Sequence, residues 1–420
     1  MKRFRVWALA LILLLIPIPP ASAATLGPAL SYDELRTLAS QANDGDVLLV
    51  AGDFSAGDDD VLSISASVRI SSAPGESATI RGLHLRDASV TFSNVNLEDS
   101  LVVEGTSFVE VAAGVAISGA PGQSGLAFSG NGTLIVDRNS DVLGGSSSTG
   151  VSISHQGGEF YGSIEGSVRG GDGSTGGAGM IISPLGDAGT VMISGTIRGG
   201  DGTSMGGHAL NLYGLSGNAF VTVAGTLTGG DGYVGGDGIQ LVSATDVVSV
   251  GISGDVKGGQ GESYGGSALM LMNVEGASSF NLSGSFTGGD AVGADAQPGT
   301  SLLLVGDSAA SHTRVNNCIL EDGHHLNGDA QATEAPEQLI QPTVTPLPEI
   351  TSSIDDVAVL PTPQPTETPE PSDTPEPANT ESPSAAPDWD DADIATPSEA
   401  SRADAYLNQP EEIAEAETDK

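Results

Sequence analysis

The chain has 420 residues and a formal net charge of −40, with 14 lysines and arginines against 54 acidic residues. Such an excess of negative charge repels nucleic acid and anionic membrane surfaces, so both are excluded as partners and cations are favoured. The single cysteine, Cys318, excludes an internal disulfide framework, and packing must hold the fold together.

Residues 1–23 have the three parts of a secretory signal peptide. Basic residues at positions 2–5 precede an apolar run at 6–16, and the small-residue motif 21–23 follows. This order predicts cleavage before Ala24 and a secreted, extracellular protein, with attachment to the cell surface left open. An uncleaved membrane anchor is the alternative, which the prolines at 17, 19 and 20 disfavour.

Residues 24–45 predict an N-terminal cap that contains a short helix. Ser31 and Glu34 fit a capping box, in which Glu34 would accept from the Ser31 amide. Leu35, Leu38 and Ala39 then recur at helical spacing and predict one apolar face. The helix would cover the open end of a β body that starts at residue 46.

From residue 61 to 119, apolar residues alternate with polar ones over short runs, as in Val68 and Ile70 or Val90 and Phe92. Period two predicts strands with one buried face. Strands this short and regular are compatible with a sandwich, a propeller or a solenoid.

A sequence repeat across positions 164–291, with a period of about 30 residues, decides among these architectures. Its marker is a glycine turn, and each unit adds about five inward apolar residues, too few for a four-stranded propeller blade. Earlier units are shorter, because the same apolar pair recurs at Leu101, Leu126 and Val151. The turns begin at Gly170, Gly199, Gly229, Gly258 and Gly288.

We therefore predict an all-β fold, a single-stranded right-handed parallel β-helix of about nine or ten coils spanning residues 46–328. The cap at Leu35–Ala42, the entry Asp44-Gly45-Asp46 and the length of the coils resemble the pectate-lyase-like superfamily. The resemblance covers roughly residues 30–320 and implies the architecture alone. Enzymes of that superfamily use calcium with an arginine base, or clustered aspartates beside a Gly-His-Gly segment, and this sequence matches neither motif.

Residues 329–420 are rich in proline, threonine and acidic side chains. Such a segment has too little apolar surface to offset its chain entropy, so we predict a disordered acidic tail.

One aspartate recurs in the glycine turns, and we call this set the aspartate column: Asp172, Asp201, Asp231 and Asp290, with Gln260 in the fourth turn. Stacked carboxylates repel each other unless they are neutralised, and Ca²⁺ is a candidate ligand because it prefers oxygen donors. The alternative is that each carboxylate accepts from the amides of its own turn while Arg169, Arg198 or Lys257 screens the charge. We favour these hydrogen bonds within the turn over Ca²⁺ binding.

No set of residues predicts catalysis, because the arginines of the body form no recognisable cluster in the sequence. A binding role is open, since Tyr161, Tyr213, Tyr233 and Tyr264 are the tyrosines expected to face outward. Tyr233 and Tyr264 occupy matching places in successive turns and are candidate ligand-binding residues. The sequence favours a non-enzymatic, structural or adhesive protein of a bacterial cell exterior that contacts extracellular polysaccharide or a cell-surface component. A lyase or hydrolase of acidic polysaccharide is the alternative.

Overall fold

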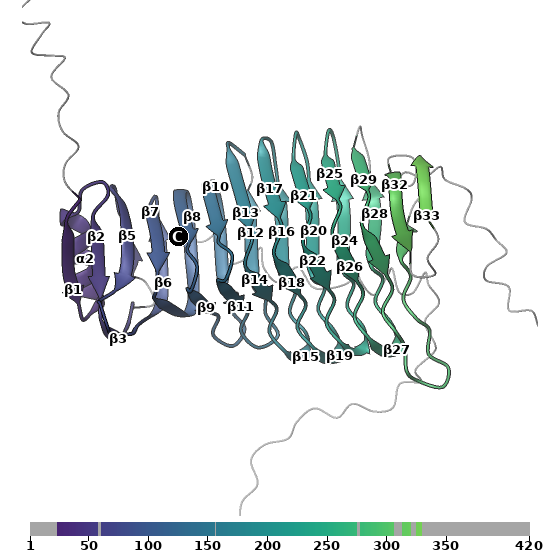
Figure 1. Cartoon of the computed structure of the whole chain (residues 1–420), viewed down its shortest axis with the longest axis horizontal. Coiled ribbons are helices and arrows are strands. Elements are labelled where there is room, and N and C mark those ends of the chain that lie inside the picture. The colour runs from purple at the N-terminus through teal and green to yellow at the C-terminus, as the bar shows by residue number, and fades with distance from the viewer. Residues whose placement is uncertain are drawn as a thin grey trace, which may run out of the picture. The chain divides into compact units, whose positions relative to one another are not determined.

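The computed structural model describes residues 23–57, 60–155, 157–274, 278–305, 313–320 and 325–329, with side chains described as far as Leu303. These residues form a parallel β-solenoid in which each coil stacks on the one before it (Figure 1). The predicted all-β parallel helix is confirmed, and the number of coils agrees roughly with the nine or ten expected.

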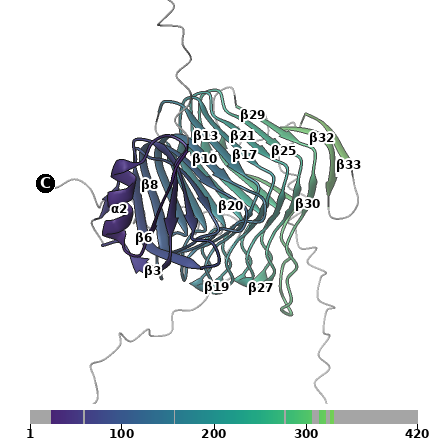
Figure 2. The ribbon, with the colours of Figure 1, turned by 60° about the vertical axis from the view of Figure 1, so that its left-hand side comes forward.

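Each coil crosses three faces in chain order, which we name A, B and C, and each face is a column of parallel strands (Figure 2). The long strands β6 (Ala78–Arg86), β8 (Asn96–Val111) and β10 (Leu126–Val136) bend at corners and serve more than one face. Face A contains β1 (Thr25–Ala29), β2 (Val47–Val50), β5 (Ser67–Ser72), β7 (Ser89–Ser93), the ends of β8 and β10, β13 (Phe160–Ile164), β17 (Gly189–Ile193), β21 (Phe220–Val223), β25 (Ser249–Ile252), β29 (Ser279–Leu282) and β32 (Thr313–Leu320).

Faces B and C follow the same stacking. Face B contains β3 (Gly52–Ser55), the starts of β6 and β8, β9 (Ala116–Ser118), β11 (Asp141–Leu143), β14 (Ser167–Arg169), β18 (Thr196–Arg198), β22 (Thr226–Thr228), β26 (Asp255–Lys257) and β30 (Ser285–Thr287). Face C contains β4 (Val61–Leu62), parts of β6, β8 and β10, β12 (Val151–His155), β16 (Met180–Leu185), β20 (Leu210–Leu215), β24 (Ile239–Ala244), β28 (Leu269–Val274) and β31 (Leu302–Val305). A last strand, β33 (His325–Asp329), pairs antiparallel with β32.

The register of face C confirms the apolar repeat. Leu126 pairs with Leu101 on one side and with Val151 on the other, and Val151 pairs with Met180. The same column continues through Leu210 and beyond, so the shorter early coils and the longer later coils share one register. The longer coils place their extra residues in one corner, and the faces stay aligned.

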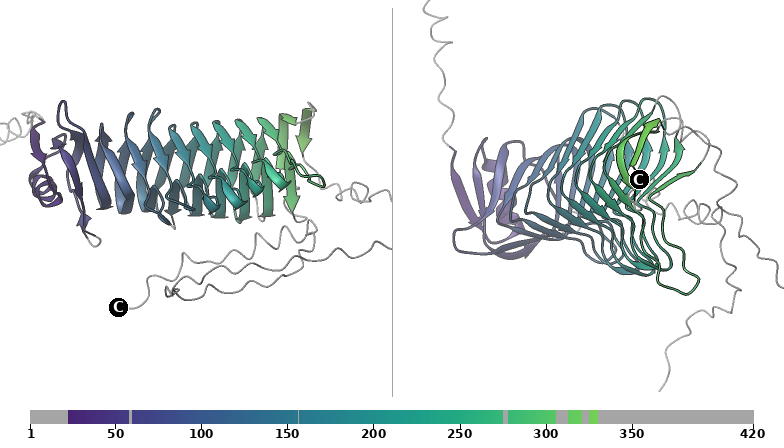
Figure 3. Two further views of the ribbon diagram at one scale, coloured as in Figure 1. Left: turned by 90° about the horizontal axis from the view of Figure 1, so that it is seen from below. Right: turned by 45° about the vertical axis from the view of Figure 1, so that its right-hand side comes forward.

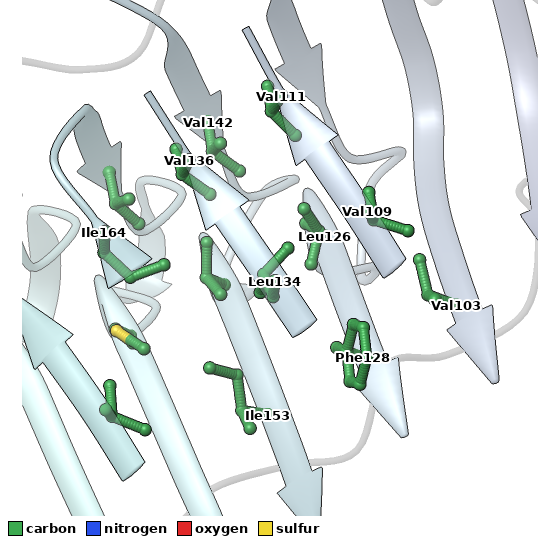
Figure 4. Close-up of a cluster of buried hydrophobic side chains, with 14 of the residues drawn as sticks. Val103, Val109, Val111, Leu126, Phe128, Leu134, Val136, Val142, Ile153 and Ile164 are labelled. Carbon is green, nitrogen blue, oxygen red and sulfur yellow. The ribbon is translucent and has the colours of Figure 1, made fainter. Parts of the chain in front are cut away.

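Inward side chains from the three faces fill a continuous apolar core. Val103, Phe128 and Ile153 point into it from successive coils (Figure 4). Phe128 also packs against Phe160, with ring centroids 5.2 Å apart. Because like residues stack in columns, this core repeats along the solenoid rather than closing around one centre.

The predicted capping helix is present as α2 (Tyr32–Gln41), beside β1 at the first coil (Figure 1). It buries Leu35 and Ala39 against the end of the core. Ser31 Oγ accepts from the Glu34 amide at 3.3 Å, as expected, but Glu34 Oε2 accepts from the Leu30 amide at 2.7 Å rather than from Ser31. The strand β1 before the helix was not predicted, because its sequence contains Gly27 and Pro28 and lacks alternation.

The glycine turn is more than the simple bend that the sequence suggested. Between faces B and C the longer coils extend into a narrow corner with its own short parallel strands, β15 (Gly173–Thr175), β19 (Gly202–Met205), β23 (Gly232–Val234) and β27 (Gly261–Tyr264). Figure 3 shows this corner as a separate ridge of strands along the solenoid.

The two sides of the corner meet at closely packed glycines, including Gly177, Gly200, Gly207 and Gly230, which we call the neck glycines. The amide of Gly200 donates to the Gly177 carbonyl of the previous coil, and the Gly207 amide donates to Gly200 within the coil, both at 2.8 Å. A Cβ on Gly200 would lie 2.2 Å from the Gly171 carbonyl oxygen. Only glycine allows backbones to approach this closely, which explains the repeat's most obvious residues.

The predicted signal peptide lies outside the described residues but for its last residue, Ala23, and the acidic tail beyond Asp329 lies wholly outside them, so their boundaries stay predictions. In the described part of the chain, no helix is long and apolar enough to cross a membrane.

Candidate functional site

The aspartate column runs along the corner ridge, and its members bond to one another's coils. Asp172 Oδ1 accepts from the Asp201 amide at 2.7 Å, and Asp201 Oδ1 accepts from the Asp231 amide at 2.9 Å. Asp231 Oδ1 accepts from the Gln260 amide at 2.7 Å. We expected each carboxylate to accept from a backbone amide of its own turn. The acceptor does bond to a backbone amide, but that amide belongs to the next coil.

Two arginines bridge successive members of the column. Arg169 Nη2 lies 2.7 Å from Asp172 Oδ1 and 3.3 Å from Asp201 Oδ2. Arg198 Nη2 lies 2.8 Å from Asp201 Oδ1 and 3.6 Å from Asp231 Oδ2. Each arginine thus stands between two carboxylates and offsets the repulsion that stacking them creates.

The geometry of the column is poorly suited to Ca²⁺. Oδ1 of each of the first three aspartates is taken by an amide, and arginines occupy the space between the carboxylates. Ca²⁺ takes 6–8 oxygen ligands, and the described residues contain no cluster of three or more potential metal-binding side chains. Asp290, at the far end of the column, lies beyond the last bridging arginine. Calcium binding stays a hypothesis that the bridging arginines disfavour.

Tyr233 and Tyr264 lie on neighbouring strands of the corner but are not opposite each other. Tyr264 pairs with Val234, because the register shifts after Gly232 pairs with Gly261. Tyr233 is 48% exposed, whereas Tyr264 is half-buried. Their role in ligand binding stays a prediction. Tyr213 is also half-buried, and burial raises its pKa.

A second candidate site was not visible in the sequence. A cleft of about 690 Å³ lies over the early coils, lined by Arg81, His84, Asp99, Ser100 and Gln123 among others. Arg81 Nε donates to Glu98 Oε2 at 2.9 Å across adjacent coils. Arg81 and Glu98 carry opposite charges at matching positions of two adjacent short coils. This match becomes visible in the sequence only once the coils are aligned.

A second charged group stands beside the cleft. Glu104 accepts from Arg86 Nε at 3.0 Å, and His84 Nε2 lies 3.1 Å from the same carboxylate oxygen without the alignment of a hydrogen bond. Burial acts to raise the pKa of Glu104, but the hydrogen bond from Arg86 and the proximity of His84 outweigh it and lower that pKa. Glu104 is therefore a charged partner that fixes Arg86 and His84, rather than a proton donor.

Backbone strain marks the cleft wall. Asp99 and Ser100 have φ values of 57° and 80°, in the left-handed region that favours glycine, and the neighbouring coil has Gly82 with φ 63° at this corner. Non-glycine residues in this region cost free energy and often occur at functional positions. The same backbone conformation occurs at other corners, for example at Asn94 and Asn139, so the cleft is a candidate site because Arg81, His84 and Asp99 line it together.

Comparison with known proteins shows no family for this chain. No family model matches the chain, and no curated protein matches it. Among solved structures, the chain is similar to the crystal structure of pectate lyase Pel9A, with 11% identity over 66% of this chain and 78% of that chain and a TM-score of 0.26. The parallel β-helix itself is established by the strand pairing described above.

Proposed function

We propose that this protein is a non-enzymatic β-solenoid with a structural, adhesive or surface-binding role outside the cell. The observation that supports this most is the internal pairing of the repeat. Asp172, Asp201 and Asp231, its most regular polar groups, bond to the amides of following coils and to bridging arginines. Groups used in this way hold coils together and are not free for chemistry. The predicted signal peptide supports an extracellular location.

The test is to incubate the full-length protein with polyuronates and with plant and host glycans, and to measure both binding and product release. Binding without turnover supports the proposal. Release of unsaturated or reducing ends would overturn it.

The cleft supports a second candidate, a lyase or hydrolase of polysaccharide. Arg81, His84 and Asp99 line it together and supply a cation, an imidazole and a carboxylate to one cleft. If turnover is found, Arg81→Gln and Asp99→Asn should abolish it while the matched surface variant Arg138→Gln, whose side chain is 79% exposed, leaves it unchanged. Turnover that survives both cleft variants would exclude this site.

A further inference from the structure

Face A carries an outward row of aromatic residues that lies on alternate coils. Phe108 pairs with Thr133, Thr133 with Tyr161, Tyr161 with Thr190, and Thr190 with Phe220. Phe108, Tyr161 and Phe220 are 39%, 40% and 43% exposed. We call Phe108, Thr133, Tyr161, Thr190 and Phe220 the aromatic row. It runs across β8, β10, β13, β17 and β21, which lie side by side (Figures 1 and 2).

The spacing of the row is regular because the strands set it. Neighbouring strands lie about 4.8 Å apart, so rings on alternate coils recur about every 9.6 Å along the solenoid. Between the rings, the threonines add a hydroxyl that both donates and accepts hydrogen bonds. The surface therefore alternates an apolar ring with a small polar group.

A role in stability does not explain this arrangement. Aromatic side chains stabilise a solenoid when they are buried and touch, as Phe128 and Phe160 do at 5.2 Å. The rings of the aromatic row are kept apart by threonine and are partly open to water. Placing them on successive coils would bury more of each ring, so the alternation points to a partner outside the chain.

Charge indicates what kind of partner fits. The neighbouring outward row begins beside Phe108 with Glu110, whose carboxylate accepts from Thr91 Oγ1 at 2.8 Å. On the following coils it continues without charge, through Ile135, Ser163, Met192 and Thr222. The two rows are uncharged over these coils, but acidic side chains flank them, with Glu159 just before β13 and Asp137 and Glu165 just after β10 and β13. The acidic flanks repel a polyanion, and the rows themselves offer a polycation no ion pair, so a neutral partner fits the rings best. Phe108 also lines two shallow hollows of about 440 and 270 Å³, whose walls include Arg69 in the first and Asp87 and Thr133 in the second.

A second copy of the chain is a poorer fit. Phe108, Tyr161, Met192 and Phe220 are 39–43% exposed, which at roughly 200 Å² per side chain leaves about 300 Å² of open surface. A stable protein interface buries about 800 Å² on each partner. A patch of this size is typical of a functional surface on a monomer.

We propose that the aromatic row binds a neutral, extended, β-linked polysaccharide that lies along the solenoid axis. Sugar rings present apolar C–H faces that pack on aromatic side chains, while their hydroxyls bond to groups such as Thr133 and Thr190. In a β1→4-linked chain each ring is turned over relative to the last, so the same ring face returns at every second sugar. This matches one aromatic ring on every second coil. The inference deepens the surface-binding role proposed above and rests on it.

The test is a binding titration of the full-length protein onto insoluble β1→4 glucan and β1→4 mannan, with a coiled α-linked glucan and polygalacturonate as comparisons. The protein should bind the two β-linked glycans and neither comparison. Tyr161→Ala and Phe220→Ala should each weaken binding about tenfold, as expected for a central contact, and Tyr161→Trp should retain it. Leu143→Ala is the matched control, because Leu143 is a large apolar side chain that is 42% exposed but lies on face B.

A spectroscopic reading complements the titration. Tryptophan occurs in the sequence only at positions 7 and 389, so Phe220→Trp places a reporter on face A. Its emission should shift to the blue when β1→4 glucan oligomers are added, and Leu143→Trp on face B should not respond.

The outcomes separate this inference from the proposed function. Equal binding by a folded Tyr161→Ala/Phe220→Ala variant overturns the inference. If the protein binds other glycans or cell surfaces but neither β-linked glycan, the inference fails and the surface-binding role stands. Binding to no surface at all overturns both.

Discussion

The amide of Asp201 donates to Oδ1 of Asp172 at 2.7 Å, although the two residues are 29 positions apart. Arg169 bridges the same two aspartates, since its Nη2 binds Asp172 and also lies 3.3 Å from Asp201 Oδ2. An aspartate in this column therefore ties its coil to the next through its own side chain.

Replacing Asp201 should loosen two contacts between coils at once. Asp201→Ala removes the acceptor for the Asp231 amide and the carboxylate between Arg169 and Arg198. Because hydrogen bonds to charged groups are worth about 1.5–3 kcal/mol and this site is partly exposed, we expect a loss of about 1–2 kcal/mol in the free energy of unfolding. Chemical denaturation followed by circular dichroism measures it. Asp290→Ala is the control and should change stability by less than about 0.5 kcal/mol.

The same contacts predict the response to calcium. Arginines and amides already bind the carboxylate oxygens of the column, so few oxygens are left as ligands for Ca²⁺. We therefore expect that neither added Ca²⁺ nor a chelator changes the melting temperature of the wild-type protein. A rise with Ca²⁺ that disappears in Asp172→Asn/Asp201→Asn would show instead that the column binds the ion. Differential scanning calorimetry in matched buffers decides between these results.

The neck glycines should tolerate no side chain. In Gly230→Ala, the new Cβ would lie 1.9 Å from the Gly200 carbonyl oxygen, so a coil must shift to accept it. We expect a loss of about 3 kcal/mol or more, or failure to fold. Gly251→Ala is the matched control, since a Cβ there meets nothing within 4 Å, and it should be neutral or stabilise by about 0.5 kcal/mol. Equal effects of the two substitutions would refute the steric explanation.

The coil repeat was predictable because burial imposes it on the sequence. Leu126, Val151, Met180 and Leu210 occupy one column, and an apolar residue is needed at every step. The corner sheet was missed because Gly173–Thr175 and its counterparts bury no alternating side chains, so their strand character comes from stacking alone.

The surface features were harder to predict for a related reason. Phe108, Tyr161 and Phe220 are 53 and 59 positions apart, and the coils between them differ in length, so no fixed period in the sequence shows the row. The Arg81 and Glu98 pair is hidden in the same way by the short early coils. Relationships between outward residues depend on register, which only the pairing of inward residues establishes.

Asp46 should make the cap sensitive to acid. Its carboxylate is buried and accepts from the Asn43 amide at 2.8 Å and the Ala24 amide at 2.7 Å, and these bonds, that from Asn43 first, lower its pKa. The predicted cleavage before Ala24 would make the second donor a charged amine, which lowers the pKa further.

A carboxylate with a lowered pKa stabilises the fold above the ordinary aspartate value of about 3.9, and this stabilisation is lost as pH falls through the lowered value. Asp46→Asn has one acceptor oxygen in place of two and no charge, so it should melt below the wild type at pH 5–7. The gap should begin to narrow as pH falls below about 4, where the unfolded chain binds the proton first, and should close once pH falls through the lowered pKa of the folded protein. Asp53→Asn, at an exposed position on β3, should show no gap at any pH. A difference between Asp46→Asn and the wild type that stays constant down to pH 3 would mean that packing, rather than the ionised carboxylate, holds the first coil to its cap.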